Sequence, residues 1–514
     1  MNLIFLILAS VFLIPYPFEL AKKDQALVCE YWVAPPPEGN NDNPGTFVQP
    51  WATLEYAATK VPDNGCTVWL KDGEYLGENK LRERYTIPTT FKAQNPYKAV
   101  MINDGMVINI SGGQNMVFDG FEFRHSGPGA SALVVKADRA GDQWAEYITF
   151  RNNIFHDSYN NDLLKVHNGS RFITIEGNVF YNQQGPDQHI DVNSVTDVTI
   201  QDNIFFNDFA GSGRTNERNT KHFIVIKDSN GESDGLLGGK RVTVRRNIFL
   251  NWEGGKGETL IQVGNDGEPY YEADTVRIEN NLFIGNSSNL TGAVLGVSGV
   301  RNVWFVNNTV AGDLPSGAYA FRVDQKGSNP QNQNIYFYNN IWSDPTGTMG
   351  ADLSKEGNIF SRGEPSEVSN LILDNNLYGN GPKLVPPGEV ASPLQDDARR
   401  VVANPLLNTH QEEIVLPRWN GSAFLSGNLS IRQEFVRLVE LYGKIPVYSP
   451  AIGRADPALM PPDDILSHPR SASPDLGAYE VVQPPIDPRI SVLFTIFHSL
   501  ANTLKRLQHY LTGD

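Results

Sequence analysis

The chain has 514 residues and a formal net charge of −16. That charge argues against nucleic acid as the main partner, because the phosphate backbone would be repelled. The length exceeds what one compact hydrophobic core usually holds. A solenoid escapes this limit because each of its coils contacts only the neighbouring coils.

The first segment, residues 1–26, contains a 12-residue apolar run at residues 3–14, with Ser10 as its one polar residue. The run is too short to span a bilayer and long enough for the hydrophobic part of a secretory signal. We therefore expect a secreted protein that works outside the cell or on its surface. An uncleaved signal that serves as an anchor stays open, because no positive charge precedes the run and no clear cleavage site follows it. An N-terminal core helix is the third reading.

Residues 27–75 are predicted to form an N-terminal cap and the first coils. The chain has two cysteines, Cys29 and Cys66, and each belongs to a predicted strand. Because export places the chain in an oxidising compartment, we expect one disulfide between them. Two buried free thiols are the alternative.

A short amphipathic helix is predicted within this cap, over residues 50–61. It begins at Pro50, a residue that suits a helix start. Its apolar side chains fall on one helical face, and they are Trp51, Leu54, Ala58 and Val61. We expect this helix to cover the open end of the solenoid, as terminal repeats require.

Residues 76–425 carry a repeated motif in which an asparagine is followed by two apolar residues. The clear copies start at Asn153, Asn178, Asn203, Asn247 and Asn281, and place a phenylalanine two residues later at Phe155, Phe180, Phe205, Phe249 and Phe283. Weaker copies start at Asn308, Asn340 and Asn376, and an earlier one has Gly120 at the asparagine position. Successive copies lie 25 to 44 residues apart, which indicates a stacked repeat.

The segments between these asparagines are short β-branched runs without helical periodicity. A stack of such coils is a parallel β-helix. Each asparagine is expected at a tight corner between two strands, in a left-handed backbone conformation. Its amide would bind the coils above and below, while the phenylalanines point into the interior.

The C-terminal part is predicted to be different in kind. Residues 426–483 should form a capping segment, with a helix over 431–443 that ends at Gly443, followed by a stretch rich in proline and aspartate. Residues 484–514 should form an amphipathic helix. We expect that helix to dock on the solenoid; contact with a membrane surface or a partner is the alternative.

The chain resembles the pectate-lyase-like superfamily, whose members are secreted, polysaccharide-active proteins with a right-handed parallel β-helix fold. The resemblance covers most of residues 30–480. It rests on "DNPGTFVQPWAT" (42–53) before the first coils, on the asparagine-marked coils, and on the ending "SPAIGRADPA…PDLGAYE" (449–480). It implies a right-handed β-helix with a short N-terminal capping helix and a C-terminal helical or irregular cap. It leaves the reaction open, because one fold hosts lyases, hydrolases, epimerases and adhesins.

One strand of each coil should carry outward side chains that form a column along the solenoid. The two-residue period of a strand assigns them once the apolar residues are turned inward. The outward set is Lys165 and His167, then His189, Asp191 and Asn193, then Val225 and Lys227, then Leu260 and Gln262, and finally Arg322. This is either an ordinary solvated strand face or a site.

The resemblance implies calcium at this column. Pectate lyases carry "D-G-x-x-D" on the equivalent strand, and "DQHID" (187–191) is similar in spacing, with Gln188 in place of the glycine. Asp187 and Asp191 carry over as calcium ligands. Asp162, which lies 25 residues before Asp187, adds a third carboxylate. Oxygen ligands of this kind suit Ca²⁺.

Calcium with nearby cations suits the β-elimination of a uronate polymer, in which negative charge builds up on the substrate carboxylate. The family uses an arginine or a lysine as the base. We nominate Lys227, with a pKa lowered by neighbouring cations, and His189 or His222 as alternatives. Arg322 would clamp a substrate carboxylate. The alternative interpretation is that Lys227 is a surface lysine without a catalytic role, paired with Asp228 or Glu253.

The predicted partner is therefore an acidic polysaccharide, bound by a monomer with the help of Ca²⁺. Residues expected to touch the glycan are Lys165, His167, Asn193, Gln262, Trp252 and Tyr270. The two aromatic side chains, with Tyr271, lie in inserted loops, where they would either stack on sugar rings or cover the solenoid flank. A glycoside hydrolase with paired carboxylates and a non-catalytic carbohydrate-binding solenoid remain as alternatives.

Overall fold

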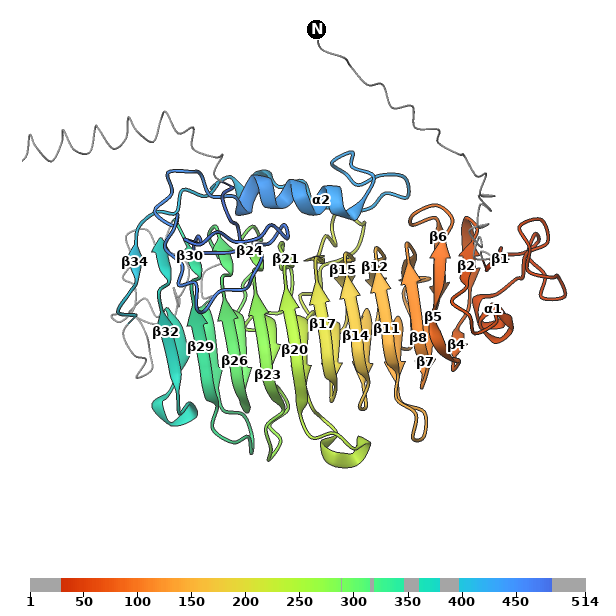
Figure 1. Cartoon of the computed structure of the whole chain (residues 1–514), viewed down its shortest axis with the longest axis horizontal. Helices are drawn as coiled ribbons and strands as arrows, with labels where there is room; N and C mark the ends of the chain where they lie inside the picture. The colour runs from red at the N-terminus through yellow and green to blue at the C-terminus, as the bar shows by residue number, and fades with distance from the viewer. Residues whose placement is uncertain (1–28, 288, 315–318, 346–359, 380–396, 483–514) are drawn as a thin grey trace, which may run out of the picture.

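The computed structural model describes residues 29–287, 289–314, 319–345, 360–379 and 397–482. The expected signal segment at 1–26 and the expected C-terminal helix at 484–514 lie outside these residues (Figure 1). Within the described part of the chain, no helix is both long and apolar enough to cross a membrane.

The chain is wound into a right-handed parallel β-helix, as predicted (Figure 1). Three parallel sheets, here called sheets A, B and C, run along its length. In each coil the chain passes through sheet C, then sheet A, then sheet B, before it rises to the next coil.

The strands have the following bounds. Sheet A contains β1 (Glu30–Val33), β2 (Thr67–Leu70), β5 (Arg84–Ala93), β8 (Gln114–Asp119), β11 (Glu146–Arg151), β14 (Arg171–Glu176), β17 (Thr196–Gln201), β20 (Gly239–Arg245), β23 (Ala273–Glu279), β26 (Val300–Val306), β29 (Gln333–Tyr338) and β32 (Leu371–Asp374). Sheet B contains β3 (Gly73–Leu76), β6 (Ala99–Asn103), β9 (Glu122–His125), β12 (Ile154–Ser158), β15 (Val179–Gln183), β18 (Ile204–Phe206), β21 (Ile248–Phe249), β24 (Leu282–Ile284), β27 (Thr309–Ala311), β30 (Ile341–Ser343), β33 (Leu377–Gly379) and β34 (Val401–Val402). Sheet C contains β4 (Asn79–Leu81), β7 (Ile108–Ser111), β10 (Val135–Asp138), β13 (Leu164–His167), β16 (Gln188–Asn193), β19 (His222–Lys227), β22 (Thr259–Val263), β25 (Ala293–Ser298), β28 (Tyr319–Asp324) and β31 (Ser361–Gly363).

The asparagine ladder lies at the corner between sheets A and B, and its amides link successive coils. Asn203 donates from Nδ2 to Oδ1 of Asn247 at 3.0 Å and to the carbonyl oxygen of Ile175 at 2.9 Å. The same pattern continues from Asn153 to Asn376. These buried bonds satisfy corner groups that no strand pairing can reach.

The predicted backbone conformation of the ladder was misplaced by one residue. The left-handed residue is the one before each ladder asparagine, for example Asn152, Asp202 and Asn280 with φ of 53°, 59° and 56°. Gly120 likewise occupies this preceding position, and Phe121 stands where the other coils have the asparagine. The ladder asparagines are selected for their amides and not for a left-handed backbone.

The phenylalanines behind the ladder form a continuous stack in the interior, as predicted. Ring centroids of Phe155, Phe180 and Phe205 are 4.6 and 5.0 Å apart, and the stack continues through Phe249 to Phe283. These rings are fully buried. Their spacing follows the distance between parallel strands, so each coil repeats the contact of the one below.

The N-terminal cap holds helix α1 (Leu54–Lys60), which begins after the N-cap residue Thr53 and contacts β1 and β4. The predicted helix was therefore right in place and too long at its start. Cys29 and Cys66 are joined by the expected disulfide, which ties the segment before β1 to β2.

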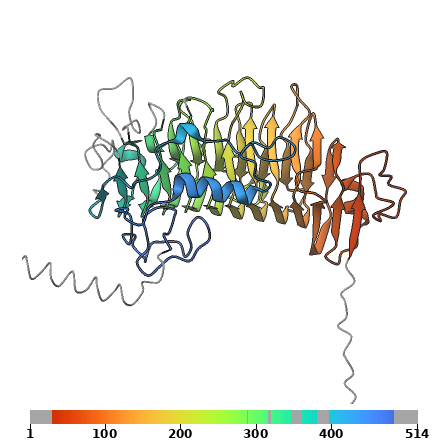
Figure 2. The same cartoon turned by 90° about the horizontal axis from the view of Figure 1, so that it is seen from above.

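The C-terminal segment runs along the solenoid over sheet B, and Figure 2 shows its helix above the strands. Helix α2 (Ile431–Leu438) continues as the π-helix η4 (Val439–Gly443), so the helical stretch ends at Gly443 as predicted. Phe435 and Leu438 pack on outward residues of sheet B such as Ile248 and Leu282. Three short 3₁₀ turns complete the described elements, namely η1 (Gly231–Asp234), η2 (Pro365–Glu367) and η3 (Gln411–Glu413).

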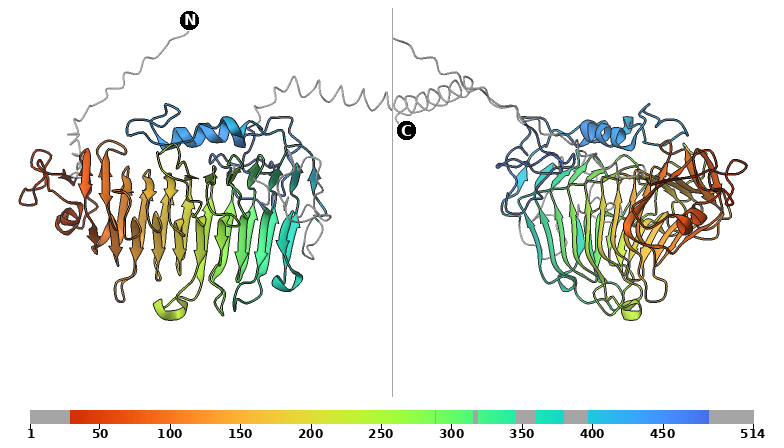
Figure 3. Two further views of the ribbon diagram at one scale, coloured as in Figure 1. Left: turned by 180° about the vertical axis from the view of Figure 1, so that it is seen from behind. Right: turned by 45° about the vertical axis from the view of Figure 1, so that its right-hand side comes forward.

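Sheet B is thus covered by the C-terminal segment, whereas sheets A and C turn their outer faces away from it (Figure 3). The interior is filled by apolar side chains of all three sheets. Of the three sheets, A and C therefore have outer faces that no described segment covers as the C-terminal segment covers sheet B.

Candidate functional site

The polar column predicted on sheet C exists. Lys165 pairs in register with Asp191, and Asp191 pairs with Val225. One step further along the strands, His167, Asn193 and Lys227 occupy equivalent positions on three successive coils. The intervening residues, Leu164, Val166, Ile190, Val192, Ile224 and Ile226, lie in the core. The two-residue period of a strand therefore predicted correctly which side chains of β13, β16 and β19 face outward here.

His189 was wrongly assigned to the outer face. It is fully buried at the start of β16, where its ring contacts Phe205 and Phe223. The chain turns from sheet B into sheet C there, so the alternation breaks and two consecutive residues face the interior. Leu260 is misassigned for the same reason. The equivalent residues of other coils are apolar, namely Val107, Val134, Leu163, Phe223 and Val294.

Burial lowers the pKa of His189 to about 3, although Asn207 partly opposes the shift through a 3.0 Å contact with Nε2. The imidazole is therefore neutral at physiological pH. Enclosed within the core and away from the outer face of sheet C, His189 has no route to a substrate and is removed as a candidate base.

Three carboxylates and one lysine form the centre of the outer face of sheet C, here called the carboxylate cluster: Asp162, Asp187, Asp191 and Lys165. Lys165 donates from Nζ to Oδ2 of Asp191 at 2.5 Å, and the same Nζ lies 4.0 Å from Oδ2 of Asp162. Asp162 and Asp191 are buried, whereas Asp187 is half-buried. One ammonium group thus serves two buried carboxylates.

The cluster is short of hydrogen-bond donors. Among the described residues no donor reaches Oδ2 of Asp162 or Oδ1 of Asp191, although both atoms are buried. Oδ1 of Asp162 accepts one bond from the backbone N–H of Gln188 at 3.0 Å. Buried carboxylate oxygens normally have partners, so these two atoms mark a place where a cation or a polar ligand would be stabilised.

The electrostatics agree with this deficit. Burial, followed by the charge of Asp191, raises the pKa of Asp162 well above its ordinary value. Burial also raises the pKa of Asp187, against the effect of Lys221 and Lys165. For Lys165, burial lowers the pKa, but Asp191 and Asp162 outweigh it and the net shift is upward. The carboxylates repel one another, and Lys165 stays charged.

The 25-residue spacing of Asp162 and Asp187 is one residue short of the repeat at sheet C, so these two residues do not pair in register. In the register of β13 and β16, Leu164 pairs with Ile190, so Asp162 lies opposite Gln188. The repeat is 26 residues at sheet C and 25 residues at the asparagine ladder. Ligand atoms of Asp162, Asp187 and Asp191 do not all come within 4.8 Å of one another in the described structure.

Lys227 lies one coil after Asp191 and faces outward, as predicted. Its Nζ contacts both carboxylate oxygens of Asp266, at 3.2 and 3.1 Å. Burial lowers the pKa of Lys227, but Asp191 and Asp266 outweigh it and raise it above its ordinary value. This direction is opposite to the expected one. The alternative interpretation, a lysine held in an ion pair, is right that Lys227 is paired. Its partner is Asp266 and neither Asp228 nor Glu253.

The remaining polar candidates are held by neighbours. Asn193 exchanges two hydrogen bonds with Ser229. Gln262 donates to the carbonyl oxygen of Gly264 at 2.6 Å and is buried. These amides therefore shape the face rather than present free groups to a ligand.

Arg322 stands in the same column as Asp191, four coils further along the solenoid. Its guanidinium contacts Asp324 at 2.8 Å and the carbonyl oxygen of Gly257 at 2.5 Å. Four inter-strand spacings separate it from the carboxylate cluster, or roughly 19 Å. Arg322 therefore lies too far from Asp191 to contact the same sugar residue.

Trp252 does not offer a stacking surface. Its ring is only 4% exposed and packs edge-on against Phe223. Of the two readings of this residue, coverage of the solenoid flank is correct. Tyr270 is half-buried, and its hydroxyl donates to the carbonyl oxygen of Asp228 at 3.2 Å.

Two acidic residues of the face were missed from the sequence. Asp138 lies 3.2 Å from Nε2 of His167, and its pKa is held well below its ordinary range by His167 and other donors despite burial. Strand β10 has the same alternation as β13, so one further step back along the repeat would have found it. Asp266 lies in a loop, where no periodic signal exists.

His222 remains on this face as the alternative base. Its Nδ1 lies 2.9 Å from the carbonyl oxygen of Thr259. Burial lowers its pKa to about 3, so the ring is neutral at physiological pH.

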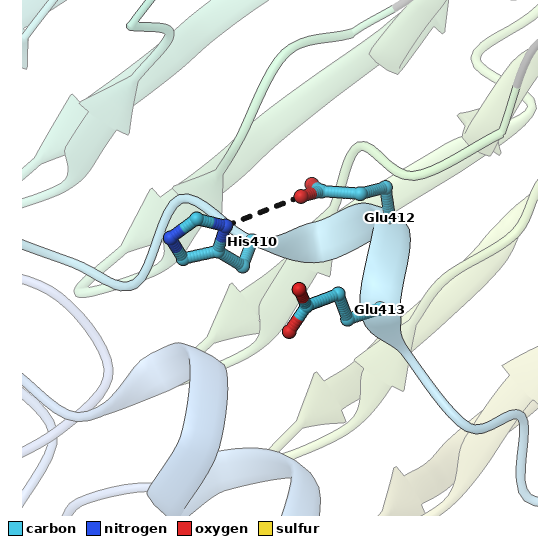
Figure 4. Close-up of side chains that lie close together, drawn as sticks. All are labelled: His410, Glu412 and Glu413. Atoms are coloured by element: carbon cyan, nitrogen blue, oxygen red, sulfur yellow. Dashed lines mark hydrogen bonds and ion pairs between the residues drawn. The ribbon is translucent and has the colours of Figure 1, made fainter.

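A separate group of possible metal ligands lies on the C-terminal segment. Side-chain ligand atoms of His410, Glu412 and Glu413 lie within 4.8 Å of one another, and Figure 4 shows them around the turn η3. His410 and Glu412 are 3.2 Å apart, with both side chains 68% exposed. Exposed groups of this kind are common without a metal, and no buried unpartnered atom marks this one.

No family model and no curated protein matches the chain by sequence. Among solved structures it is similar to a pectate lyase, Pel9A, with 16% identity, 88% of this chain and 96% of that chain covered, and a TM-score of 0.45. It is also similar to XylC in complex with xylose, with 11% identity, coverages of 88% and 98%, and a TM-score of 0.49. A third structure is the family 6 alginate lyase AlyGC, with 12% identity, coverages of 89% and 60%, and a TM-score of 0.43. At these identities the likeness concerns the fold.

Proposed function

We propose that this chain is an exported carbohydrate-active enzyme that cleaves an acidic, uronate-containing polysaccharide by calcium-assisted β-elimination on the outer face of sheet C. The observation that carries the proposal is the carboxylate cluster, in which one buried oxygen each of Asp162 and Asp191 has no hydrogen-bond partner in the described part of the chain, beside a lysine. Lys227 faces outward on the next coil.

The cluster fits a calcium ion by its chemistry. Ca²⁺ takes carboxylate oxygens in flexible geometries, and Asp162, Asp187 and Asp191 would hold it. Burial raises the pKa values of Asp162 and Asp187 despite the opposing charge of Lys165, so a bound cation would favour their ionised forms. When bound, the ion would neutralise the substrate carboxylate, on which charge accumulates during elimination.

The chain's own residues would then divide the work. A base must take the proton from the carbon next to the uronate carboxylate. The electron pair of that C–H bond forms a C=C bond as the C–O bond to the next sugar breaks, and the departing oxygen takes a proton from the protonated base or from water. Lys227 is the proposed base. It must first release its own proton, and neutralising Asp191 helps, because that carboxylate is the largest charge that raises the pKa of Lys227. Lys165 and His167 face the same side and would bind glycan oxygens.

A glycoside hydrolase is the second candidate, and the coupling of the carboxylates favours it. Hydrolysis needs one protonated and one ionised carboxyl group on opposite sides of the bond. Burial and Asp191 give Asp162 a raised pKa, as a general acid requires. Against this, one ammonium contacts both carboxyl groups, at 4.0 Å from Asp162 and 2.5 Å from Asp191, so they do not stand on opposite sides of an open cleft.

A substrate screen separates the candidates. The purified protein is incubated with pectate, alginate and glycosaminoglycans, with calcium or with a chelator. We expect an ultraviolet-absorbing unsaturated product from at least one uronate polymer, and its loss with chelator. New reducing ends without that absorbance would establish hydrolysis instead, and binding without cleavage would establish the non-catalytic solenoid.

A further inference from the structure

The outer face of sheet A is the second uncovered surface of the solenoid. Figure 1 looks onto this sheet, and no described segment crosses its middle strands, whereas the C-terminal segment lies over sheet B. Two adjoining grooves of about 590 and 640 Å³ run along this face. They share one floor, made by a column of small side chains: Val117, Thr149, Thr174, Thr199 and Thr243.

The floor repeats with the coils. Thr149, Thr174 and Thr199 pair in register on three successive strands. A polar hydroxyl therefore recurs at every inter-strand step, roughly every 4.8 Å. Each hydroxyl both donates and accepts a hydrogen bond, so the floor suits a ligand that presents hydroxyl groups at regular intervals.

Two aromatic rings form one wall. Tyr147 and Phe172 are 47% and 40% exposed, and they stack with centroids 4.7 Å apart and planes 7° from parallel. Both have a left-handed backbone, with φ of 54° and 55°. The other left-handed residues of this column are Asn115, Asp197, Arg241, Thr275, Asn302 and Asn334. Asparagine and aspartate suit that conformation far better than an aromatic residue does. Two exposed aromatic rings at such positions are not explained by packing in the core.

The charged groups around the grooves balance one another. The lining holds three arginines and three carboxylates, namely Arg151, Arg241, Arg245, Asp197, Glu176 and Glu279. Arg241 is paired with Asp197 at 2.7 Å, and Gln201 links Glu176 at 2.9 Å to Arg245 at 3.0 Å. A surface with no net charge does not attract a polyanion, so its electrostatics match an uncharged ligand.

We propose that the outer face of sheet A is a binding surface for a neutral polysaccharide, with Tyr147 and Phe172 as the stacking platform. The apolar C–H face of a sugar ring lies against the aromatic wall, while the threonines and the paired polar groups bind its hydroxyls. This surface is separate from the carboxylate cluster, the proposed site for an acidic glycan. The protein would thereby hold on to an uncharged matrix while sheet C contacts a different polymer.

Affinity gel electrophoresis of the full chain tests this inference. The probes are hydroxyethylcellulose, xyloglucan, glucomannan and a β-1,3-glucan, with pectate as the acidic probe. The double variant Tyr147→Asn/Phe172→Asn should fold, because asparagine occupies the same position in other coils. We expect at least one neutral glycan to retard the parent. The double variant should bind that glycan roughly two- to tenfold more weakly, the loss expected when an aromatic platform is removed.

Tyr448→Asn is the matched control, because Tyr448 is 76% exposed on the C-terminal segment. It should bind like the parent, and the double variant should melt at the parent temperature or above it. Asp191→Ala should also leave this binding unchanged, which separates the surface from the proposed reaction. The inference is overturned if no neutral glycan retards the parent, if the folded double variant binds as tightly as the parent, or if Asp191→Ala abolishes the binding.

Discussion

Lys165 contacts Asp191 on the next coil, with its Nζ 2.5 Å from Oδ2, and the other oxygen of that buried carboxylate has no hydrogen-bond partner among the described residues. The same ammonium is 4.0 Å from Asp162. A single positive charge thus faces two buried carboxylates, with Asp187 nearby. This imbalance distinguishes the carboxylate cluster from an ordinary solvated strand face.

Calcium should stabilise the protein through this imbalance. A ligand that binds the folded site and not the unfolded chain raises the free energy of unfolding, by about 2.7 kcal/mol at a hundredfold excess over Kd. The melting temperature rises accordingly. Asp191→Ala should abolish the calcium-induced rise measured by calorimetry. Asp274→Ala, which removes a sheet A carboxylate paired with Arg301 at 2.8 Å, should retain it. Equal calcium responses in the two variants would show that the cluster is not the site.

Replacing Lys165 should reveal the competition between its ammonium and calcium. Lys165→Met leaves Asp191 buried without a cation, so the calcium-free protein should lose about 3 kcal/mol of unfolding free energy. Calcium should bind this variant more tightly than the parent, as titration calorimetry would show. Weaker calcium binding would mean that Lys165 organises the cluster rather than competing for it.

His156 should make the stability depend on pH. Its ring lies between Asp157 at 2.9 Å and Glu122 at 3.1 Å. Burial lowers its pKa, but these two carboxylates outweigh it and raise the pKa from 6.5 to about 9. The ion pairs therefore stabilise the fold fully below pH 6.5, and this contribution, at most about 3 kcal/mol, is lost as pH rises through 9.

Urea unfolding at pH 6.5 and at pH 9 measures that loss. His156→Gln should be less stable at pH 6.5 and should show a smaller decrease between the two pH values. His410→Gln is the control, because His410 is 68% exposed and should leave the profile of the parent unchanged. A His156→Gln profile as steep as that of the parent would assign the pH dependence to other groups.

The asparagine ladder should carry measurable stability. Asn203→Ala removes bonds to Ile175 and Asn247 and leaves the backbone N–H of Asn178 without its acceptor. Each unsatisfied buried group costs roughly 1–3 kcal/mol, so we expect a loss of about 3 kcal/mol in denaturant unfolding. Asn370→Ala, whose side chain is exposed, should change stability by less than about 0.5 kcal/mol. Comparable losses in both variants would contradict a structural role for the ladder.

The fold was readable from the sequence because it repeats. An asparagine followed two residues later by phenylalanine, as at Asn178 and Phe180, marks the same corner in five successive coils and fixes their register. The left-handed residue was misplaced because Asn152 and Asn153 are adjacent and only the backbone distinguishes their roles. Single-residue shifts such as that of Asp162 arise where coils differ in length by one residue.

The site was readable only where its residues lie on strands. Asp191 and Lys227 follow the two-residue period and were placed correctly. The assignment of His189 to the outer face was wrong because the corner before β16 turns two consecutive residues inward, and the two-residue period of a strand does not predict such a bend. Asp266 was not predicted as part of the face because loop residues follow no period. Its carboxylate is the partner of Lys227. Position along the chain predicted the column, but not the partners of its members.

The central claim is tested most directly by the rate at which Lys227→Ala forms the unsaturated product from a uronate polymer in saturating calcium. We expect the parent to form it and Lys227→Ala to be slower by roughly 100-fold or more, the usual contribution of a general base. The variant should still show the calcium-induced rise in melting temperature. Lys92→Ala, which removes a lysine 3.5 Å from Asp119 on sheet A, should keep the parent rate. Formation of the product by Lys227→Ala at the parent rate, or no such product from any uronate polymer with the parent, would contradict the account.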